Sequence, residues 1–165
     1  MEKYLYLTIL VFSFIVPVSY TFHPRLKFYQ NFNSFALGFL LMFFVFIPWD
    51  IWFTDLGIWG FNQDYLTGIF FFNLPLEEYL FFFVIPYVCI FTYHVVCVLS
   101  KPSIFSSNKI AYFLSVLLFV FGVVFLHKWY TSITFISLSV LLLISTRFVD
   151  MTLFFKSFLI ILIPF

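Results

Sequence analysis

Long apolar runs, interrupted by short polar segments, dominate the pattern along the chain. They cover residues 4–22, 33–52, 76–99, 110–126 and 132–146, and a sixth run begins at residue 153. A helix needs about 20 apolar residues to cross the roughly 30 Å of hydrocarbon in a bilayer. The runs lack the period-2 alternation of strands, and only helices and closed barrels span membranes. The pattern therefore predicts an all-α integral membrane protein, a polytopic helical bundle of about six spans.

Composition supports the same class. Hydrophobic residues make up 64% of the 165 residues and charged residues 9%, with 30 phenylalanines, and the mean hydropathy is +1.13. These values exclude an ordinary soluble domain. A signal peptide is the alternative for the first run because Lys3 precedes it, but no small-residue cleavage site follows. We therefore expect the lipid bilayer as a partner, and no nucleic acid.

The basic residues predict an orientation. Most of the Lys and Arg residues fall in the connections after the first, third and fifth runs: Arg25, Lys27, Lys101, Lys109, Arg147 and Lys156. Only Lys3 and Lys128 fall on the other side. Because cytoplasmic connections carry the excess of positive charge, we expect a multi-pass protein of the cytoplasmic membrane with its N-terminus outside.

The acidic residues gather in one part of the chain. Five of the seven lie between positions 50 and 78, where no Lys or Arg occurs: Asp50, Asp55, Asp64, Glu77 and Glu78. Asp55 and Asp64 have a sufficient explanation as ordinary solvated loop residues. The other three require a separate account.

Glu77 and Glu78 follow Pro75 at the start of a predicted helix. One carboxylate there would be explained by the positive end of the helix dipole. Two of them, followed at once by aromatic residues, place at least one carboxyl at the edge of the hydrocarbon, where an isolated anion tends to take up a proton. The pair would titrate in coupled steps, which provides a general acid beside a carboxylate able to act as a base.

Asp50 ends the second apolar run in our interpretation, after Pro48 and Trp49. The excursion from there to Pro75 returns the chain to the same membrane face, so Asp50 and the two glutamates are expected to converge. Many aromatic residues surround them in sequence, and aromatic faces attract cations. An interfacial aromatic belt explains each ring singly. Acids combined with aromatic faces in a dry pocket suit protonation of an alkene and shelter of the resulting carbocation.

Several motifs carry a resemblance to a known family. They are "FIPWD" at 46–50, "GIWGFNQDYLTGI" at 57–69, "LPLEEYLFF" at 74–82 and "IPYVCIFTY" at 85–93. Together they resemble the small integral-membrane lycopene cyclases of carotenoid biosynthesis. These occur as two-subunit bacterial enzymes, as fused chains and as the cyclase half of fungal cyclase/phytoene synthase proteins. The resemblance is strong over residues 1–100 and weak over the remainder.

The resemblance implies an enzyme that closes the end groups of a linear carotene into β-ionone rings, an isomerisation without electron transfer. It places the catalytic role on Glu77, Glu78 and Asp50, and leaves open which glutamate donates the proton. Whether Asp50 or the other glutamate removes the final proton also stays open, as does the choice between one and two rings and between β and ε rings. The residues expected to bind the substrate are Trp49, Asn62, Tyr65, Tyr79 and Phe82.

No cofactor is expected. The five glycines never form a dinucleotide-binding or P-loop motif, so the nucleotide fold of the flavin-dependent lycopene cyclases is absent, although flavin bound in another way stays open. His23, His94 and His127 are scattered without helical pairing, and no metal site is predicted. We interpret His94 as a packed or interfacial residue.

The chain divides, in our interpretation, into a first three-helix unit at 1–100, a connector helix with loops at 101–131, and the start of a second unit at 132–165. "TRFVDMTLFFKSFLIILIPF" at 146–165 echoes residues 23–50, which predicts a parallel repeat. A second acidic motif would follow residue 165, so we expect a C-terminally truncated chain. A second cyclase subunit, a homo-oligomer or the missing half would then complete it.

Two further classes of function fit the same residues. A small proton-coupled carrier would use the acids as transport sites, but would be expected to carry charges inside its spans. A non-enzymatic membrane subunit would use both glutamates only to cap a helix.

Overall fold

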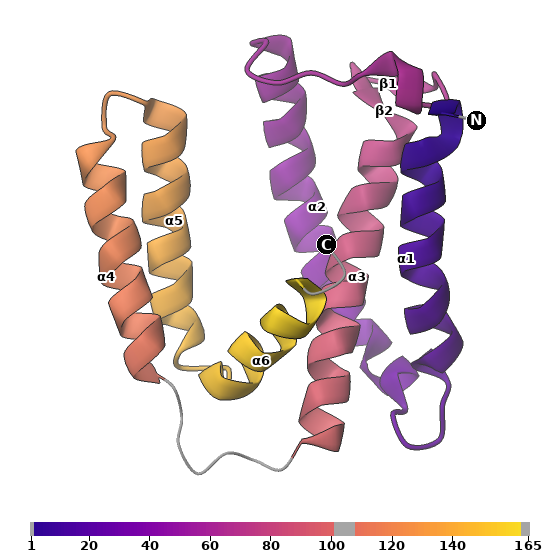
Figure 1. Ribbon diagram of the computed structural model, residues 1–165, viewed down its shortest axis with the longest axis vertical. Helices are drawn as coiled ribbons and strands as arrows, with labels where there is room; N and C mark the ends of the chain where they lie inside the picture. Colours follow the sequence, from indigo (N-terminus) through magenta and orange to yellow (C-terminus); the bar gives the residue numbers. More distant parts are fainter. Residues whose placement is uncertain (1, 101–107, 163–165) are drawn as a thin grey trace. The chain divides into compact units, whose positions relative to one another are not determined.

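The computed structural model describes residues 2–100 and 108–162, and these residues are mostly α-helical (Figure 1). The chain divides into two compact units, Met1–Val98 and Leu99–Phe165. Lys101 and the last three residues of the predicted second unit lie outside the described residues. The predicted α-helical class is confirmed, and six α-helices are present in the described part of the chain.

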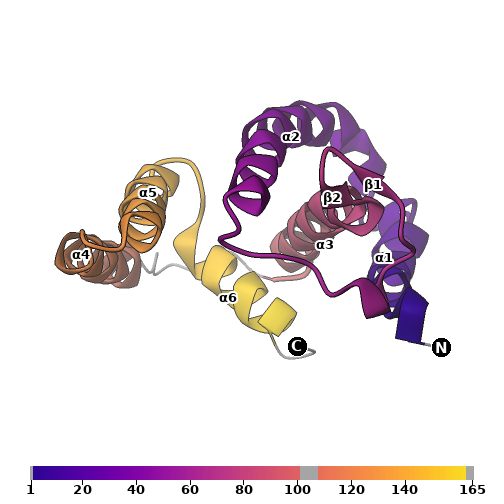
Figure 2. The same cartoon turned by 90° about the horizontal axis from the view of Figure 1, so that it is seen from above.

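The first unit contains three long helices, α1 (Leu5–Thr21), α2 (Phe32–Asp55) and α3 (Leu76–Leu99). Helix α3 lies between the other two, and the N-terminus and a small hairpin lie at the same end of the unit (Figures 1 and 2). The shorter elements are η1 (Glu2–Tyr4), η2 (Phe28–Asn31), η3 (Gln63–Tyr65), β1 (Phe70–Phe71) and β2 (Leu74–Pro75). All three helices contain an interior proline, which neighbouring helices make tolerable in an apolar bundle.

Helix α2 is longer than the sequence indicated. The expected end near Trp52, with Asp50 at the boundary, is wrong, because the helix continues to Asp55. Its true end is set by Gly57, which has a φ of +67°. The amide of Gly57 donates to the carbonyl of Thr54 and that of Ile58 to the carbonyl of Phe53, the pattern of a Schellman motif. Asp50 therefore lies inside a helix.

A two-residue β-hairpin precedes α3. Phe70 pairs with Pro75 and Phe71 with Leu74 in antiparallel register. The loop residues Phe72 and Asn73 have φ values of 47° and 63°. Positive φ at both central positions matches the type I′ turn that suits two-residue hairpins. The hairpin ends directly at Leu76, so its position fixes where the glutamate pair enters the unit.

Aromatic side chains form the core at the other end of α3. The ring of Phe28 lies 5.5 Å from that of Tyr87 and 5.4 Å from that of Phe91, both in edge-to-face geometry, which favours aromatic pairs. The hydroxyls of Thr21 and Tyr87 form a hydrogen bond between α1 and α3. This core fixes α1 against α3, and therefore also positions the side chains at the acidic end.

The second unit contains α4 (Asn108–Val124), α5 (Trp129–Ser145) and α6 (Met151–Leu162). Helices α4 and α5 pack as a hairpin through small residues. Ser115 donates to the carbonyl of Ser139 at 2.9 Å, and Ser139 donates to the carbonyl of Ser115 at 2.8 Å. A Cβ placed on Gly122 would lie 2.6 Å from Cγ1 of Ile136. Close approach of these two helices thus depends on Gly122.

Two segments are long and apolar enough to cross a membrane by length and composition. These are Phe28–Asp55, which joins η2 to α2, and Leu76–Leu99. The remaining apolar helices of the described residues are 10–17 residues long.

Candidate active site

Glu77 lies in the first turn of α3 and is fully buried, with an exposure of 0%. The backbone amide of Thr67 donates a hydrogen bond to its Oε1 at 2.6 Å. Its Oε2 is a buried oxygen without a hydrogen-bond partner among the described residues. The side chain therefore connects the loop after η3 to the start of α3, and protein surrounds both of its oxygens.

Glu78 is the next residue but has a different environment. It is partly buried, and the hydroxyl of Tyr6 in α1 donates to its Oε1 at 2.9 Å. One oxygen of Glu78 is thus held by α1, and the side chain as a whole is less buried than that of Glu77.

Asp50 is the third predicted acid, and only 6% of its surface is exposed. The indole Nε1 of Trp59 donates to its Oδ1 at 2.8 Å. The ring of Trp59 stacks on Phe53 at 5.0 Å, and Phe53 stacks on Trp49 at 4.7 Å. Asp50 is therefore anchored by a stack of three aromatic rings at one end of α2.

Electrostatic interactions connect Glu78 to the other two acids. The charges of Asp50 and Glu77 both act on Glu78, and the charges of all three act on the phenol of Tyr6. Glu78 thus lies within electrostatic reach of the two other residues for which the sequence predicted a catalytic role.

Three of the predicted aromatic substrate residues, Trp49, Tyr79 and Phe82, lie on α2 and α3. The hydroxyl of Tyr79 donates to the carbonyl of Phe71 at 2.9 Å, which ties α3 to the hairpin. Phe82 stacks with Phe46 of α2 at 6.4 Å. Trp49 belongs to the stack beside Asp50. All three side chains are partly exposed, so packing leaves part of each ring accessible.

Asn62 and Tyr65 are exposed and flank a different surface. Oδ1 of Asn62 accepts the amide of Asp64 and caps η3. Both residues line a groove of about 320 Å³ between α1 and the loop from Gly60 to Leu66, which we call the Tyr6 groove; its other lining residues are Leu5, Tyr6, Ile9, Gly60, Phe61 and Leu66. The same Tyr6 that holds Glu78 therefore forms part of its wall.

A second groove of about 510 Å³, the hairpin groove, lies between α2, α3 and the hairpin. Its lining is apolar except for the phenol of Tyr79: Phe43, Phe44, Ile47, Pro48, Ile51, Phe71, Phe72, Leu76 and Tyr79. Asp55, at the end of α2, is exposed and accepts a hydrogen bond from Nδ2 of Asn73 at 2.8 Å. Asp55 thus has a local structural role, while Asp64 is exposed and its backbone amide donates to Asn62.

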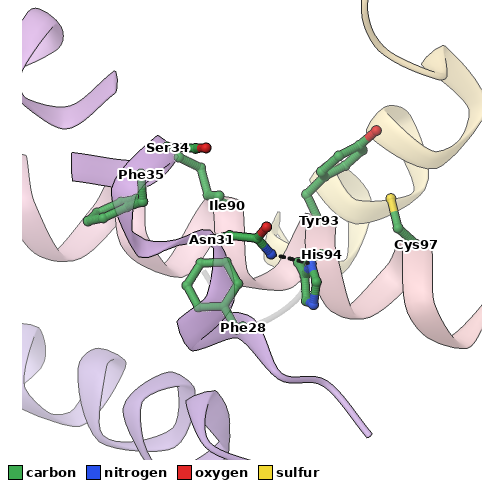
Figure 3. Close-up of a pocket in the computed structure, with 8 residues that line it drawn as sticks. All are labelled: Phe28, Asn31, Ser34, Phe35, Ile90, Tyr93, His94 and Cys97. Carbon is green, nitrogen blue, oxygen red and sulfur yellow. Dashed lines mark hydrogen bonds between the residues drawn. The ribbon is translucent and has the colours of Figure 1, made fainter. Parts of the chain in front are cut away.

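His94 lies toward the other end of α3, in a pocket of about 370 Å³ with Phe28, Asn31 and Tyr93 (Figure 3). Its Nε2 contacts the carbonyl of Leu26 at 2.7 Å, so this nitrogen carries the proton. Its Nδ1 then accepts from Nδ2 of Asn31 at 3.5 Å, a long hydrogen bond. The contacts fit the interpretation of His94 as a packed residue that orders the loop before α2.

Tyr6 and Thr67 were not singled out by the sequence. A tyrosine in an apolar run is ordinarily an interfacial anchor, and the only available signal was that a buried phenol needs a partner. Thr67 acts through its backbone amide, for which no residue type is diagnostic.

An acidic cluster surrounded by aromatic side chains, in a helical unit, defines a site suited to proton transfer next to a hydrophobic molecule. A family model described as lycopene cyclase matches residues 3–96 and 127–165 of the chain. The match covers most of the sequence, and the protein therefore belongs to the lycopene cyclase family. The predicted resemblance is confirmed, and it supports a carotenoid cyclase function in general. Comparisons with curated proteins and with solved structures found no match.

Proposed function

We propose that this protein cyclises the end groups of linear lycopene to β-ionone rings by acid catalysis, with Glu78 as the proton donor. The observation that carries the proposal is the contrast between the two glutamates. Glu77 is fully enclosed and bonded to the loop, whereas Glu78 is only partly buried and has one oxygen fixed by Tyr6. A proton donor must be within reach of the substrate carbon, which favours the less enclosed of the two carboxyl groups.

The proposed reaction conserves all atoms and needs no oxidant. The carboxyl proton of Glu78 adds to one carbon of the terminal alkene, whose π electrons form the new C–H bond and leave a tertiary carbocation. A second alkene of the same chain attacks this cation, which forms the ring C–C bond and moves the charge to a ring carbon. Loss of a proton from the neighbouring carbon restores a double bond. The products are γ-carotene after one closure and β-carotene after two.

Asp50 is the proposed acceptor of the final proton, and return of that proton from Asp50 to Glu78 restores the acid for the next closure. Trp59 holds one of its oxygens, and the acid lies within electrostatic reach of Glu78. A carboxylate also stabilises the cationic intermediates, as do the faces of nearby aromatic rings, by about 0.5–2 kcal/mol for each cation–π contact. In this proposal Glu77 is a positioning residue, because it fixes the loop and the first turn of α3 rather than the substrate.

A multi-pass location in the cytoplasmic membrane, with the N-terminus outside, is part of the proposal. Two segments have the length and composition of membrane spans. Large apolar side chains are widely exposed on both units, including Phe12 at 69%, Phe44 at 72% and Phe113 at 67%. Such a surface needs lipid or a partner to cover it. A second cyclase subunit or another copy of the chain is a proposed partner.

Pigment analysis of a lycopene-accumulating bacterial host that expresses residues 1–165 tests this function. New γ- or β-carotene would support it, and its loss in Glu78→Gln would assign the proton donor. Unchanged lycopene from a membrane-inserted chain would overturn the proposal for the chain alone. Co-expression with the second subunit of a two-subunit lycopene cyclase would then test whether a partner completes the enzyme, and continued absence of rings would reject the cyclase function.

A further inference from the structure

We propose that the Tyr6 groove, and not the larger hairpin groove, binds the end group of the linear polyene that is to be cyclised. This inference rests on the proposed function and extends it by assigning the substrate a place. The occupant is the acyclic terminal segment of a carotene, and the remainder of the polyene runs along the apolar outer surface of α1.

The first argument is connection to the acid. The proton donor must lie within reach of the alkene carbon that it protonates. Tyr6 lines the groove and donates its hydroxyl to Oε1 of Glu78 at 2.9 Å. In the hairpin groove the polar side chain is that of Tyr79, whose hydroxyl is directed to the carbonyl of Phe71 and not to an acid. A molecule in the Tyr6 groove is thus one side chain away from Glu78.

The second argument is the chemistry of the walls. Leu5, Ile9 and Leu66 supply an apolar surface, and Tyr6, Phe61 and Tyr65 supply three aromatic rings. Aromatic faces stabilise a nearby carbocation without reacting with it as a strong base would. The hairpin groove has aliphatic and aromatic walls as well, but the phenol in its wall donates to a backbone carbonyl, whereas the phenol of Tyr6 donates to a carboxyl group.

The third argument is size. Ligand pockets generally begin at about 300 Å³, and the Tyr6 groove has about 320 Å³. This volume accepts one terminal segment but not a whole carotene. The rest of the hydrocarbon needs an apolar path, and Val16, Phe12 and Ile9 of α1 are 60%, 69% and 48% exposed.

Cysteine protection tests the location without relying on catalysis. Cys89 and Cys97 are replaced by alanine, and Ile9→Cys reports on the Tyr6 groove while Phe44→Cys reports on the hairpin groove. The purified full chain is placed in lipid vesicles, with or without lycopene. It is then labelled with a membrane-permeant maleimide. Lycopene at about ten times its Kd is expected to slow labelling of Ile9→Cys about tenfold and to leave Phe44→Cys unchanged. Protection of Phe44→Cys alone would overturn the inference.

A matched pair of glycine variants adds a functional readout. A Cβ on Gly60 meets nothing within 4 Å, and the same holds for Gly38 on α2, away from the groove. Gly60→Leu is expected to fill the groove and reduce ring formation at least about tenfold, about 1.4 kcal/mol in the barrier, whereas Gly38→Leu retains it. Equal activity of the two variants would contradict the inference.

The outcomes separate the inference from the function that it extends. Protection of Ile9→Cys by lycopene in a protein that forms no rings, alone or with the second subunit, would reject the cyclase function and retain the binding site. Ring formation without protection of Ile9→Cys would reject the binding site and retain the cyclase function. Absence of both protection and ring formation, again alone and with the second subunit, would reject both.

Discussion

The hydroxyl of Tyr6 and Oε1 of Glu78 lie 2.9 Å apart although 72 positions separate the two residues in the chain. Helix α1 thereby takes part in the acidic site at the start of α3. A hydrogen bond to one oxygen of a carboxyl group fixes the orientation of that group. The neighbouring residues Glu77 and Glu78 have the same side chain but thus lie in different environments.

Replacing each glutamate by glutamine separates the roles proposed for them. Glu78→Gln removes the transferable proton and is expected to lower ring formation by about 10²–10⁴-fold, the usual contribution of a general acid. Glu77→Gln keeps a carbonyl oxygen that accepts the amide of Thr67, so most activity is expected to remain. Chromatography of the pigments, normalised to the amount of membrane protein, measures both. The reverse ranking would show that Glu77 is the donor.

The contribution of Tyr6 is measured by Tyr6→Phe, which removes only the hydroxyl. Glu78 becomes charged as it gives up its proton, and hydrogen bonds to charged groups contribute about 1.5–3 kcal/mol. The bond from Tyr6 therefore strengthens in the transition state, and we expect its loss to lower the rate of ring formation about tenfold or more. Tyr4→Phe is the matched control, since Tyr4 is 56% exposed. Conversion rates in vesicles at saturating lycopene distinguish an effect on the chemical step from one on binding. Equal rates for the two variants would remove Tyr6 from the catalytic site.

Trp59→Phe tests the anchor of Asp50. The variant retains a ring that can stack on Phe53 but loses the Nε1 donor, and Asp50 would become free to rotate. We expect product formation to fall severalfold while the amount of folded protein stays constant. Trp52→Phe is the comparison, because Trp52 is 52% exposed and contacts Phe53 by its edge. A loss in Trp52→Phe as large as that in Trp59→Phe would indicate a general packing effect.

Gly122→Leu tests the packing of α4 against α5. A Cβ at this position would lie 2.6 Å from Cγ1 of Ile136 and 3.2 Å from its backbone nitrogen. Overpacking of this kind costs about 1–3 kcal/mol, so the thermal stability of the protein in detergent is expected to fall. Gly38→Ala has open space and serves as the control. Unchanged stability in Gly122→Leu would show that the two helices can separate without cost.

The sequence predicted the helices because apolar runs of this length leave few alternatives. It also predicted the start of α3 at Leu76, since Pro75 and the following glutamates are typical of a helix N-terminus. The end of α2 was misjudged because Asp50, a polar residue, was taken as the boundary. Gly57, which forms the Schellman motif, is the residue that ends the helix.

The sequence did not predict the β-hairpin or the hydrogen-bond partners of the acidic residues. Type I′ turns are usually recognised by Asn-Gly or Asp-Gly, whereas this turn is Phe72-Asn73. The bond from Tyr6 to Glu78 joins residues far apart in the chain, and no periodicity reports such a pairing. The roles of Asp50, Glu77 and Glu78 stay predictions, as do those of Trp49, Asn62, Tyr65, Tyr79 and Phe82.

The reciprocal bonds between Ser115 and Ser139 also limit how α4 and α5 can recruit neighbours. Each hydroxyl proton is directed to the carbonyl of the opposite serine. At that level the two helices have no serine proton left to offer a third helix. Recruitment of another segment there would depend on the fit of methyl and phenyl groups rather than on polar recognition. The pair of helices α4 and α5 would then accept different neighbouring segments at this level, provided that their shapes are complementary.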